Sequence, residues 1–542
     1  MRVRPPLRLN APAALAAFAV ALLALGVSGA QNPASPQTDG YRISGRVIDE
    51  VTGEPVSRAT VSVLWDDYNQ MVASTVSDAE GRFALDHIAA GKYPLSAAKR
   101  GYHTSFYDEH DTYNSAIVTG ADQDTSHLVF HLAPGAVLRG VISDDGGDPV
   151  EGANVLLFRR PAFSASGAHM EQAGNAETDD TGAYEFTNLQ SGQYFIAVKA
   201  DPWYAQHDNR PGPGGQQSPL DVAYSLTYYD STIDEGSATP VTLTAGGREE
   251  ADISLRAVPA IRLRIPGTLG APGTYLSAEQ KVFGNVIDTE RMQAGDPGQQ
   301  YVEFTGVAPG TYDLEYGDPP RRATVNAAAS LDLDPNSGTP TLDISGKLAM
   351  AGGGPVPENI QLELTEAGGG QAPQEALARG GEFDFTAVPP GTWSLRAGSQ
   401  REPLAVIATS AGGVVSAGDK LVVRDRLPSL VVTLSRAQTD VKGFARKDGK
   451  AAPGVMILLV PREPGSYPEL ARRDQSDSDG SFNLRNVPAG QYTVIAIEEG
   501  WKLDWERREV IAPYLRGGLA VTVTDQSGPV VSLAQPVQAV AR

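Results

Sequence analysis

One pattern recurs five times in this chain with the same internal spacing, and it constrains the fold more than any other feature. In each copy an aromatic or β-branched residue is followed eight positions later by glycine, and Tyr or Trp stands two positions after the glycine. Successive copies are about 80 to 120 residues apart, which is far longer than a solenoid or propeller period and matches a small β-sandwich domain. The chain is therefore predicted to be one small module repeated about five times. The copies are Phe83–Gly91–Tyr93, Tyr184–Gly192–Tyr194, Val302–Gly310–Tyr312, Phe383–Gly391–Trp393 and Phe482–Gly490–Tyr492.

The composition favours an all-β fold. The 542 residues include 58 Gly and 39 Pro, and short runs of alternating apolar and polar residues are common. Apolar spacing of the helical kind is rare over windows of ten residues. Phe83 and Leu85 alternate on one face of a predicted strand, and the other copies repeat this alternation. We therefore expect a tandem array of about five small β-sandwich domains.

The repeats also predict where the domains begin and end. A head segment with a Gly/Asp turn and a proline begins four of the units, and the third unit lacks it. The third unit is therefore expected to be a degenerate sandwich, and Arg210–Pro219 to be a long loop insertion in the second. The predicted divisions are 1–30 for a signal peptide, 31–40 for a tether, and 41–134, 135–257, 258–338, 339–436 and 437–542 for the five sandwiches.

The first thirty residues have the pattern of a signal peptide. Arg2, Arg4 and Arg8 form a basic segment, an apolar stretch covers 11–27, and the small residues 28–30 precede a predicted cleavage site. A membrane anchor is the alternative, although the apolar run is short for a membrane span. We expect export to the periplasm, the cell surface or the extracellular space, with no transmembrane span in the mature chain.

Charge and cysteine content exclude some functions. The formal net charge of −21 repels nucleic acid, so no nucleic-acid partner is expected. The chain contains no Cys, which excludes disulfides and thiol catalysis. Each predicted sandwich must therefore be stabilised by packing alone.

The first, second and fifth repeats resemble a known family, the fourth resembles it less closely, and the third does so only through its aromatic–Gly–Tyr core. The segment GRVIDEVTGEPVSRATVSV, a D-x-x-G turn at 78–81 and the F-x-L…G-x-Y core resemble the carboxypeptidase regulatory-like domain. The resemblance implies a transthyretin-like (prealbumin-like) sandwich with an Ig-like architecture of about seven strands. In the name-giving carboxypeptidases this domain accompanies a separate zinc catalytic domain and does no chemistry. Related folds are grouped with carbohydrate-binding modules, which implies a glycan role.

No catalytic motif is recognisable. None of the seven His residues has Glu three positions later, so the zinc ligands of a peptidase are missing. The sequence also lacks a nucleophile elbow, a Walker loop and a dinucleotide-binding fingerprint. We predict no enzyme activity and no cofactor. The alternative is a cryptic enzyme in the second unit, whose residues would converge only in space.

Two segments contain residues that could bind metal. The segment GYHTSFYDEHDTY includes His103, Asp108, His110 and Asp111, which are weak metal candidates, and a solvated polar loop is the alternative. The turn Asp477–Gly480 has part of a calcium loop, but it lacks the closing Glu and recurs where a hairpin needs a turn. A hairpin turn is therefore the preferred interpretation there.

Aromatic residues outside the repeat are the candidates for ligand binding. Flat rings beside carboxylates could stack on sugars or anchor a protein interface, and the alternative is that they cover sandwich ends or pack between domains. The repeated aromatics are instead expected to plug one end of each sandwich and to tie a turn through the tyrosine hydroxyl. The ligand-binding candidates are Trp65, Tyr68, Trp203, Tyr204, Tyr228, Tyr229, Trp501 and Trp505.

These observations lead to one function hypothesis and one alternative. The preferred hypothesis is a non-catalytic, rod-like array that acts as a binding or structural module at the cell surface or in the periplasm, with a glycan or an envelope protein as partner. The alternative is a passive spacer or a subunit of an envelope assembly. Any specific activity is expected in residues that the copies do not share.

Overall fold

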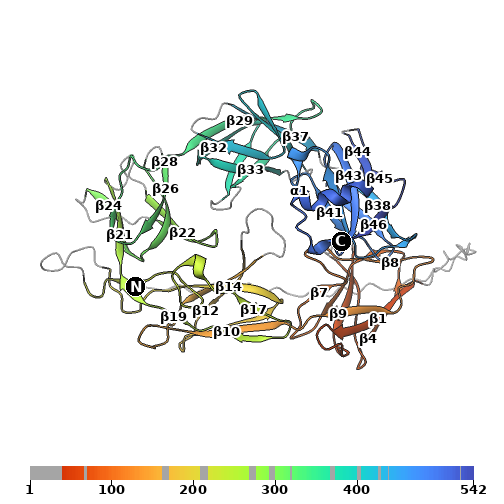
Figure 1. Cartoon of the computed structure of the whole chain (residues 1–542), viewed down its shortest axis with the longest axis horizontal. Coiled ribbons are helices and arrows are strands. Elements are labelled where there is room, and N and C mark those ends of the chain that lie inside the picture. Colours follow the sequence, from red (N-terminus) through yellow and green to blue (C-terminus); the bar gives the residue numbers. More distant parts are fainter. Residues whose placement is uncertain are drawn as a thin grey trace, which may run out of the picture. The chain divides into compact units, whose positions relative to one another are not determined.

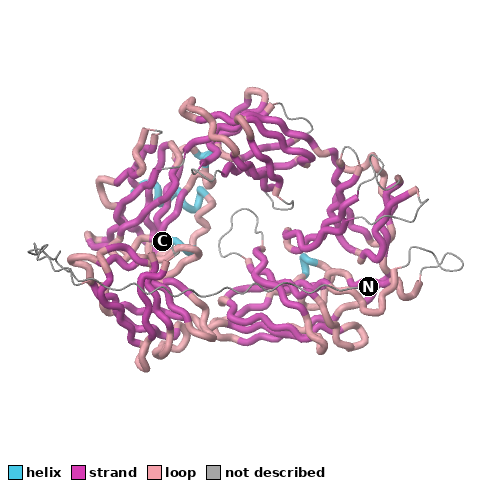
Figure 2. Tube along the Cα trace, turned by 180° about the vertical axis from the view of Figure 1, so that it is seen from behind, coloured by secondary structure: helices cyan, strands magenta, loops and turns pink. Residues whose placement is uncertain are grey.

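The computed structural model describes residues 40–65, 70–160, 170–207, 218–267, 276–291, 300–317, 320–366, 373–398, 404–424, 429–436, 439–524 and 526–542. The predicted signal peptide, all of the predicted tether except Gly40, and Tyr68 lie outside the described residues. Strands make up most of this part of the chain, and its α-helix is the single turn α1 (Arg508–Ile511) (Figure 2). None of its helices is long and apolar enough to cross a membrane.

The first sandwich contains nine strands (Figure 1). They are β1 (Tyr41–Asp49), β2 (Thr60–Leu64), β3 (Met71–Val76), β4 (Arg82–Ile88), β5 (Gly91–Tyr93), β6 (Leu95–Ala98), β7 (Ser105–Phe106), β8 (Ile117–Thr119) and β9 (Leu128–Leu132). One sheet has the order β4-β1-β9 and the other the order β3-β2-β6-β7, while β5 pairs with β8. Strand β1 is antiparallel to β4 and parallel to β9.

The second sandwich repeats this arrangement with extra strands. Its elements are β10 (Ala136–Ser143), β11 (Asn154–Arg159), β12 (Glu171–Glu177), β13 (Ala183–Leu189), β14 (Gly192–Lys199), β15 (Val222–Tyr224), β16 (Thr227–Tyr228), the 3-10 helix η1 (Glu235–Ser237), β17 (Val241–Leu243), β18 (Arg248–Glu250), β19 (Ile253–Ser254) and β20 (Ala257–Pro259). Strand β10 pairs with β13, β18 and β19, and β11 pairs with β12 and β14.

The third sandwich has the same central strands although its sequence lacks the head segment. Its strands are β21 (Ile261–Pro266), β22 (Leu276–Val282), β23 (Asn285–Arg291), β24 (Tyr301–Val307), β25 (Gly310–Tyr316), β26 (Arg321–Ala327), β27 (Leu331–Asp332) and β28 (Thr339–Pro340). Strand β21 is antiparallel to β24 and parallel to β27, and β22 pairs with β23 and β25. The unit predicted to be degenerate therefore has both sheets.

The fourth sandwich consists of two sheets of five and four strands. Its strands are β29 (Leu342–Met350), β30 (Ile360–Glu366), β31 (Gln374–Ala378), β32 (Glu382–Val388), β33 (Gly391–Gly398), β34 (Leu404–Ala411), β35 (Val414–Ala417), β36 (Lys420–Val423) and β37 (Leu430–Arg436). The sheet orders are β32-β29-β37-β34-β35 and β31-β30-β33-β36.

The fifth sandwich also contains the helical turns of the chain's last part. Its elements are β38 (Thr439–Lys447), β39 (Lys450–Ala451), β40 (Met456–Pro461), η2 (Pro464–Ser466), β41 (Arg472–Gln475), β42 (Ser481–Val487), β43 (Gly490–Glu498), η3 (Gly500–Lys502), α1, η4 (Ala512–Gly517), β44 (Leu519–Val523), β45 (Val530–Ser532) and β46 (Val537–Ala541). Strand β38 is antiparallel to β42 and parallel to β45 and β46.

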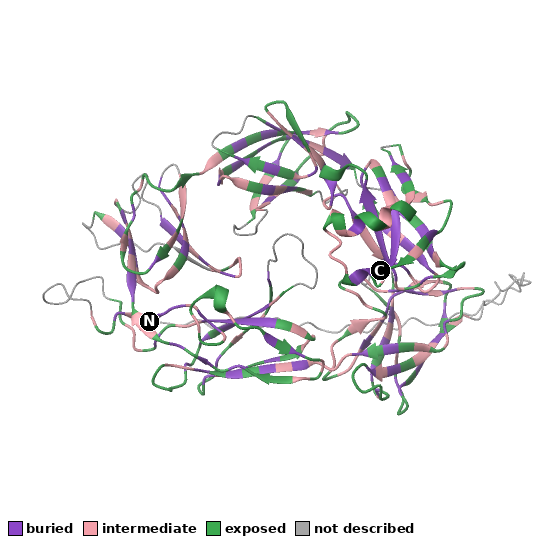
Figure 3. Ribbon diagram, in the orientation of Figure 1, coloured by how far each residue is buried: buried purple, intermediate pink, exposed green. Residues whose placement is uncertain are grey.

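All five units therefore share one topology. The first long strand of each unit pairs antiparallel with the aromatic strand and parallel with a closing strand, while a second long strand pairs with two neighbours of its own. In the fifth unit β46 pairs with both β38 and β43, so its strands form one nine-stranded sheet. Buried and exposed residues alternate along these strands (Figure 3), as expected for sheets that face a core on one side. The tandem all-β array expected from the repeat is confirmed. The exact divisions between the sandwiches stay a prediction.

The repeated aromatic residue has the predicted structural role. It is buried in every copy, and in four copies its polar atom donates a hydrogen bond to the carbonyl four residues earlier. The bonds join Tyr194 to Gln190 at 2.9 Å, Tyr312 to Ala308 at 2.7 Å, Trp393 to Pro389 at 3.1 Å and Tyr492 to Pro488 at 2.9 Å. The hydrogen bond from the hydroxyl or indole N–H thus stabilises the turn that precedes the strand of the same residue. The glycine two residues earlier leaves room for this ring, since a Cβ on Gly490 would lie 3.0 Å from the Tyr492 hydroxyl.

A left-handed residue stands four positions before that glycine in every copy. It lies where the register of the aromatic strand shifts by a β-bulge, which places one extra residue opposite the first strand. The residues are His87 (φ 63°), Asn188 (φ 59°), Gly306 (φ 74°), Ala387 (φ 55°) and Asn486 (φ 55°). Four of the five are His, Asn or Gly, which tolerate this conformation well, and the fifth is Ala387.

Candidate functional site

The structure brings together the two segments that differ most from the repeat. The segment between β7 and β8 of the first sandwich contacts the β41–β42 turn and the region around η3 of the fifth sandwich. We call this contact the first–fifth interface. Its residues are Lys92, Asp108, His110, Asp111, Tyr113, Ser115, Ala116, Val118, Arg473, Gln475, Ser476, Asp477, Ser478, Ser481, Trp501 and Trp505.

An ion pair lies at one end of the first–fifth interface. The Lys92 Nζ is 2.6 Å from the Asp477 Oδ2, and Asp477 is almost fully buried. The other carboxylate oxygen accepts the backbone N–H of Ala116 at 3.0 Å. Burial raises the pKa of Asp477, and the neighbouring Lys92 ammonium opposes that rise. The Asp477 carboxylate of the fifth sandwich therefore bonds two groups of the first sandwich, and it also accepts the Ser481 hydroxyl of its own sandwich at 3.3 Å.

Backbone groups continue the contact beside this pair. The Ser478 N–H donates to the Ala116 carbonyl at 3.0 Å, and the Val118 N–H donates to the Ser478 Oγ at 2.9 Å. The Ser115 hydroxyl donates to the Ser476 carbonyl at 3.0 Å. The two sandwiches thus satisfy each other's polar main-chain groups, which is a property of specific interfaces.

Stacked rings form the other end of the interface. His110 stacks on Trp501 with ring centroids 5.4 Å apart and planes only 10° from parallel, and Tyr113 packs on the same indole. The guanidinium carbon of Arg473 lies 4.4 Å from the centre of the Trp505 ring. Its Nη1 also donates to Asp111 at 3.2 Å. These planar groups form a layered stack in which the cation faces aromatic rings.

The four weak metal candidates are engaged in protein contacts. The Asp108 carboxylate accepts the Ser115 hydroxyl at 3.0 Å, His110 shares a hydrogen bond with Gln475 at 3.1 Å, and Asp111 bonds Arg473. His103 lies 2.7 Å from the Gln190 amide of the second sandwich. Within the residues that the structure describes, no three His, Asp or Glu side chains are grouped closely enough to hold a metal ion.

Gln475 is a central interface residue that sequence reasoning did not single out. It is buried, and its amide nitrogen donates to the Asp108 carbonyl and to the Ser115 hydroxyl. Its position on β41 has no motif around it. No local signal could have found it, since its partners lie about 360 residues earlier in the chain.

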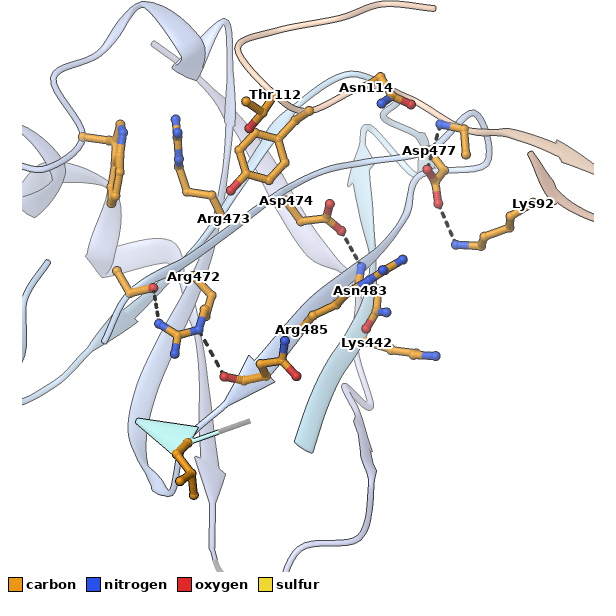
Figure 4. Close-up of a pocket in the computed structure, with 16 residues that line it drawn as sticks. Lys92, Thr112, Asn114, Lys442, Arg472, Arg473, Asp474, Asp477, Asn483 and Arg485 are labelled. Carbon is orange, nitrogen blue, oxygen red and sulfur yellow. Dashed lines mark hydrogen bonds and ion pairs between the residues drawn. The ribbon is translucent and has the colours of Figure 1, made fainter. Parts of the chain in front are cut away.

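A half-open polar cavity of about 770 Å³ adjoins the interface (Figure 4). Burial raises the pKa of Asp474 in this cavity to about 7, although the Asn483 N–H donates to its carboxylate. Arg472 donates to backbone carbonyls, including those of Ala471 and Asn486, so it holds the wall in place. The remaining wall is formed by Lys92, Thr112, Tyr113, Asn114, Ala116, Leu404, Lys442, Arg473, Asp477, Arg485 and Trp505.

The calcium-like turn of the fifth sandwich differs from its counterparts. In the first and second sandwiches, Asp78 and Asp179 each accept N–H groups two and four residues further on, which closes their own hairpin turns. In the fifth sandwich the corresponding Asp477 accepts groups of the first sandwich, and Asp479 accepts the Ser481 N–H instead. The turn has therefore kept its geometry while its first carboxylate bonds another domain.

Two of the eight ligand-binding candidates have strongly exposed rings. Trp203 is 90% exposed, with the Tyr204 ring edge-on 5.7 Å away. Trp65 is 48% exposed and lies 5.7 Å from the buried Tyr93 ring. Trp203 is the most accessible large aromatic side chain in the described part of the chain.

Four other candidates are used in packing. Tyr228 is buried and lies 5.5 Å from Phe283 of the third sandwich, and Tyr229 packs against the second core. Trp501 is 5% exposed and donates to the Gly454 carbonyl at 3.1 Å, and Trp505 packs beside it. Tyr228 and Trp501 are therefore closed to a ligand in this structure, whereas Tyr229 and Trp505 are only partly buried and Trp505 lines the cavity beside the first–fifth interface.

Curated proteins with similar sequences include a repeat-containing protein. The Serine-aspartate repeat-containing protein F of Staphylococcus epidermidis is 22% identical over 309 residues, which are 52% of this chain and 18% of that protein. Colossin-A of Dictyostelium discoideum is 21% identical over 501 residues, which are 82% of this chain and 4% of that protein. The chain thus spans less than a fifth of the length of either relative.

Solved structures that match parts of this chain include pilins. A streptococcal ancillary pilin matches 55% of this chain and all of its own length at 14% identity, with a TM-score of 0.19. The shaft pilin SpaA of Lactobacillus rhamnosus GG matches 41% of this chain and 98% of its own length at 9% identity, with a TM-score of 0.20. Residues 42–133 match the family model of the carboxypeptidase regulatory-like domain. The first sandwich of the tandem array is therefore similar to the carboxypeptidase regulatory-like domain family.

Proposed function

We propose that this protein is a non-catalytic structural module of the bacterial envelope or cell surface, in which repeated sandwiches are fixed to one another by specific contacts. The first–fifth interface carries this proposal. Outside the repeat, the side chains best suited to catalysis or ligand binding hold two sandwiches together. They are His110, Asp111, Arg473 and Trp501. Their contacts leave no set of nucleophile, base and open cavity among them.

The junction between the second and third sandwiches supports the same role. Phe283 at the turn after β22 inserts between Phe158, Phe195 and Tyr228 with centroid distances of 5.3 to 5.5 Å. The Phe283 N–H also donates to Glu235 at 2.8 Å. Aromatic contacts of this kind resist bending between domains, because separating them exposes apolar surface to water.

Localisation in the native host tests the envelope role. An epitope-tagged full-length chain should be recovered in the envelope fraction or the medium, with its predicted first thirty residues removed. Recovery of the unprocessed chain in the cytoplasm would contradict the proposal. A variant with Arg2, Arg4 and Arg8 all changed to Glu provides the control, since it should block export without touching any described residue.

Glycan binding through Trp203 is the second candidate function. The exposure of Trp203 favours it, because a Trp that is 90% exposed keeps a large apolar face in water and can stack on a sugar ring. Tyr204 flanks this face edge-on, which would restrict the orientation of a bound ring. No other ring among the candidates that the structure describes is as accessible.

Isothermal titration of the mature protein with representative soluble polysaccharides tests this second function. A binding signal that Trp203→Ala removes and Trp65→Ala retains would support a stacking site at Trp203. Absence of binding across all polysaccharide classes would exclude it. The structural role is unaffected by that result, because it depends on other residues.

A further inference from the structure

The half-open cavity beside the first–fifth interface contains two cations that have no counter-ion among the described residues. Its wall comes from three sandwiches, with Lys92 from the first, Leu404 from the fourth and Lys442 from the fifth (Figure 4). The Arg472 guanidinium donates only to backbone carbonyls, and it forms no ion pair in the described part of the chain. The Lys442 ammonium has neither a hydrogen bond nor an ion pair there. Because charges inside a cavity are normally paired, these two cations favour an anion beside them.

The carboxylates of the wall do not cancel this positive charge. Asp477 pairs with Lys92 at 2.6 Å, so each of these wall residues neutralises the other. Arg473 of the wall is likewise neutralised by Asp111 at 3.2 Å. Burial raises the pKa of Asp474 to about 7, so near pH 7 this carboxyl carries only part of a negative charge. The wall is therefore positive, although the whole chain has a net charge of −21.

One acceptor in the wall indicates that the bound molecule also has hydroxyl groups. The Oδ1 of Asn483 is buried and has no hydrogen-bond partner in the described part of the chain. The Nδ2 of the same amide donates to Asp440 at 3.1 Å, which fixes the orientation of the side chain. Asn483 on β42 is the strand partner of Lys442 on β38. An acceptor next to a cation matches a ligand that combines hydroxyl donors with an anionic group.

The size of the cavity fits a small part of a sugar chain. Its volume of about 770 Å³ lies within the range of about 300–1,000 Å³ that is usual for small-molecule sites. Because the cavity is half-open, a longer chain can continue into solvent from the bound units. The guanidinium of Arg473 lies over the Trp505 ring, so recognition depends on charge and hydrogen bonds rather than on stacking.

We propose that this cavity binds an acidic oligosaccharide, whose carboxylates are attracted by Lys442 and Arg472 and whose hydroxyls include a donor to the Asn483 Oδ1. A neutral sugar would leave the two cations without a counter-ion, and an inorganic anion such as sulfate would leave Asn483 without a donor. A carboxylated sugar satisfies both. This inference goes beyond the proposed envelope role, and it does not depend on glycan stacking at Trp203 of the second sandwich.

Isothermal titration of the full mature chain with three probes tests the proposal. Trigalacturonate carries carboxylates and hydroxyls, maltotriose carries hydroxyls alone, and sodium sulfate carries charge alone. Trigalacturonate should bind with a Kd below about 1 mM, and the other two probes should bind at least about tenfold more weakly. Added sodium chloride should weaken the binding of trigalacturonate, because it screens the attraction between the ligand and the wall. Absence of trigalacturonate binding, or equal binding of either other probe, overturns the proposal.

Variants locate the binding in this cavity. Lys442→Met removes an exposed ammonium that has no partner in the described structure, so it should weaken trigalacturonate binding at least about fivefold while the Tm stays unchanged. Arg139→Met is the matched control, since Arg139 precedes the strand glycine of the second sandwich as Lys442 does in the fifth, but it pairs with Glu250 away from the cavity. This control should change the Kd less than about twofold. Equal effects of the two variants overturn the proposal.

Trp203→Ala separates this inference from glycan stacking in the second sandwich. Trigalacturonate should bind this variant as it binds the wild type, because Trp203 does not line the cavity. Loss of trigalacturonate binding in Trp203→Ala, with binding retained in Lys442→Met, would place the acidic sugar at Trp203 and overturn the proposal.

Discussion

The Nζ of Lys92 in the first sandwich lies 2.6 Å from the Oδ2 of Asp477 in the fifth, although 385 positions separate the two residues in the sequence. Asp477 lies in a hairpin turn. In the first and second sandwiches the corresponding Asp78 and Asp179 accept N–H groups of their own turns. The Asp477 carboxylate is 13% exposed, so its ionised form depends on Lys92 and on the Ala116 N–H for stabilisation. A repeated turn has thus become a contact between two domains.

Removal of Lys92 should destabilise the protein. In Lys92→Met the Asp477 carboxylate stays buried without its cation, which should lower the free energy of unfolding by about 1–3 kcal/mol. The control Lys347→Met removes an ion pair to Glu382 whose side chains are 66% and 69% exposed, and it should cost less than about 0.5 kcal/mol. Urea unfolding at pH 8 measures both. Equal effects of the two variants would mean that the buried pair contributes no more than a surface pair.

Asp474 should make stability depend on pH. Its pKa is raised by burial from 3.8 to about 7, so its contribution is favourable while it is protonated and is lost as the pH rises through about 7. Asp474→Asn should therefore flatten the fall in stability between pH 4 and pH 8 and raise stability at pH 8, on the order of 2 kcal/mol. The exposed Asp448→Asn is the control. Parallel curves for wild type and Asp474→Asn would show that the carboxyl does not titrate in this range.

Gly140 should not tolerate a side chain. A Cβ there would lie 2.1 Å from the Ala251 carbonyl oxygen and 2.9 Å from the Tyr184 ring, which packs over the glycine. Gly140→Ala is expected to cost about 3 kcal/mol or more, because the clash is with backbone. Gly528→Ala meets no atom within 4 Å and should be nearly neutral. Thermal unfolding by calorimetry compares the two, and a neutral Gly140→Ala would contradict this packing.

Replacement of Ala387 with glycine should stabilise the fourth sandwich. Ala387 is the only one of the five left-handed bulge residues that is neither Gly, Asn nor His, and its φ is 55°. Ala387→Gly removes a strain of about 1 kcal/mol and should raise the stability of the fourth sandwich by a similar amount. Ala376→Gly, in the regular strand β31, should instead lower stability by about 0.5–1 kcal/mol. Denaturant titration distinguishes these opposite signs.

The sequence was most informative about the features that every module needs to form the same sandwich geometry. The Tyr or Trp after each glycine and the alternating strands recur because one sandwich geometry requires them, so they could be predicted from spacing alone. The β-bulge was found only in the structure. The third unit looked degenerate because its sequence lacks the head segment. In the structure, Val302 faces Ile265 at the place where the other four units pair an aromatic ring with a glycine. The apolar volume that the other units place in one aromatic ring is divided here between Val302 and Ile265, and the two strands pair in the same way.

The candidate site could be predicted only in part. The segments with His110 and Trp501 were both selected for their composition, but their stacking on each other depends on how the first and fifth sandwiches are placed in space. No periodicity or local motif carries that information. The same reason explains why Gln475, which bonds three groups of the first sandwich, was not found. Long-range domain contacts depend on complementary surfaces, which a single sequence does not reveal.

Cross-linking within the otherwise cysteine-free chain tests the first–fifth interface most directly. The Val118 N–H lies 2.9 Å from the Ser478 Oγ, so the double variant Val118→Cys, Ser478→Cys places two thiols within reach of a short bismaleimide. At micromolar protein concentration, mass spectrometry of the digest should show one intramolecular cross-link joining these positions, and each single variant should show none. A double variant that reacts at both thiols without joining them would contradict contact between the first and fifth sandwiches.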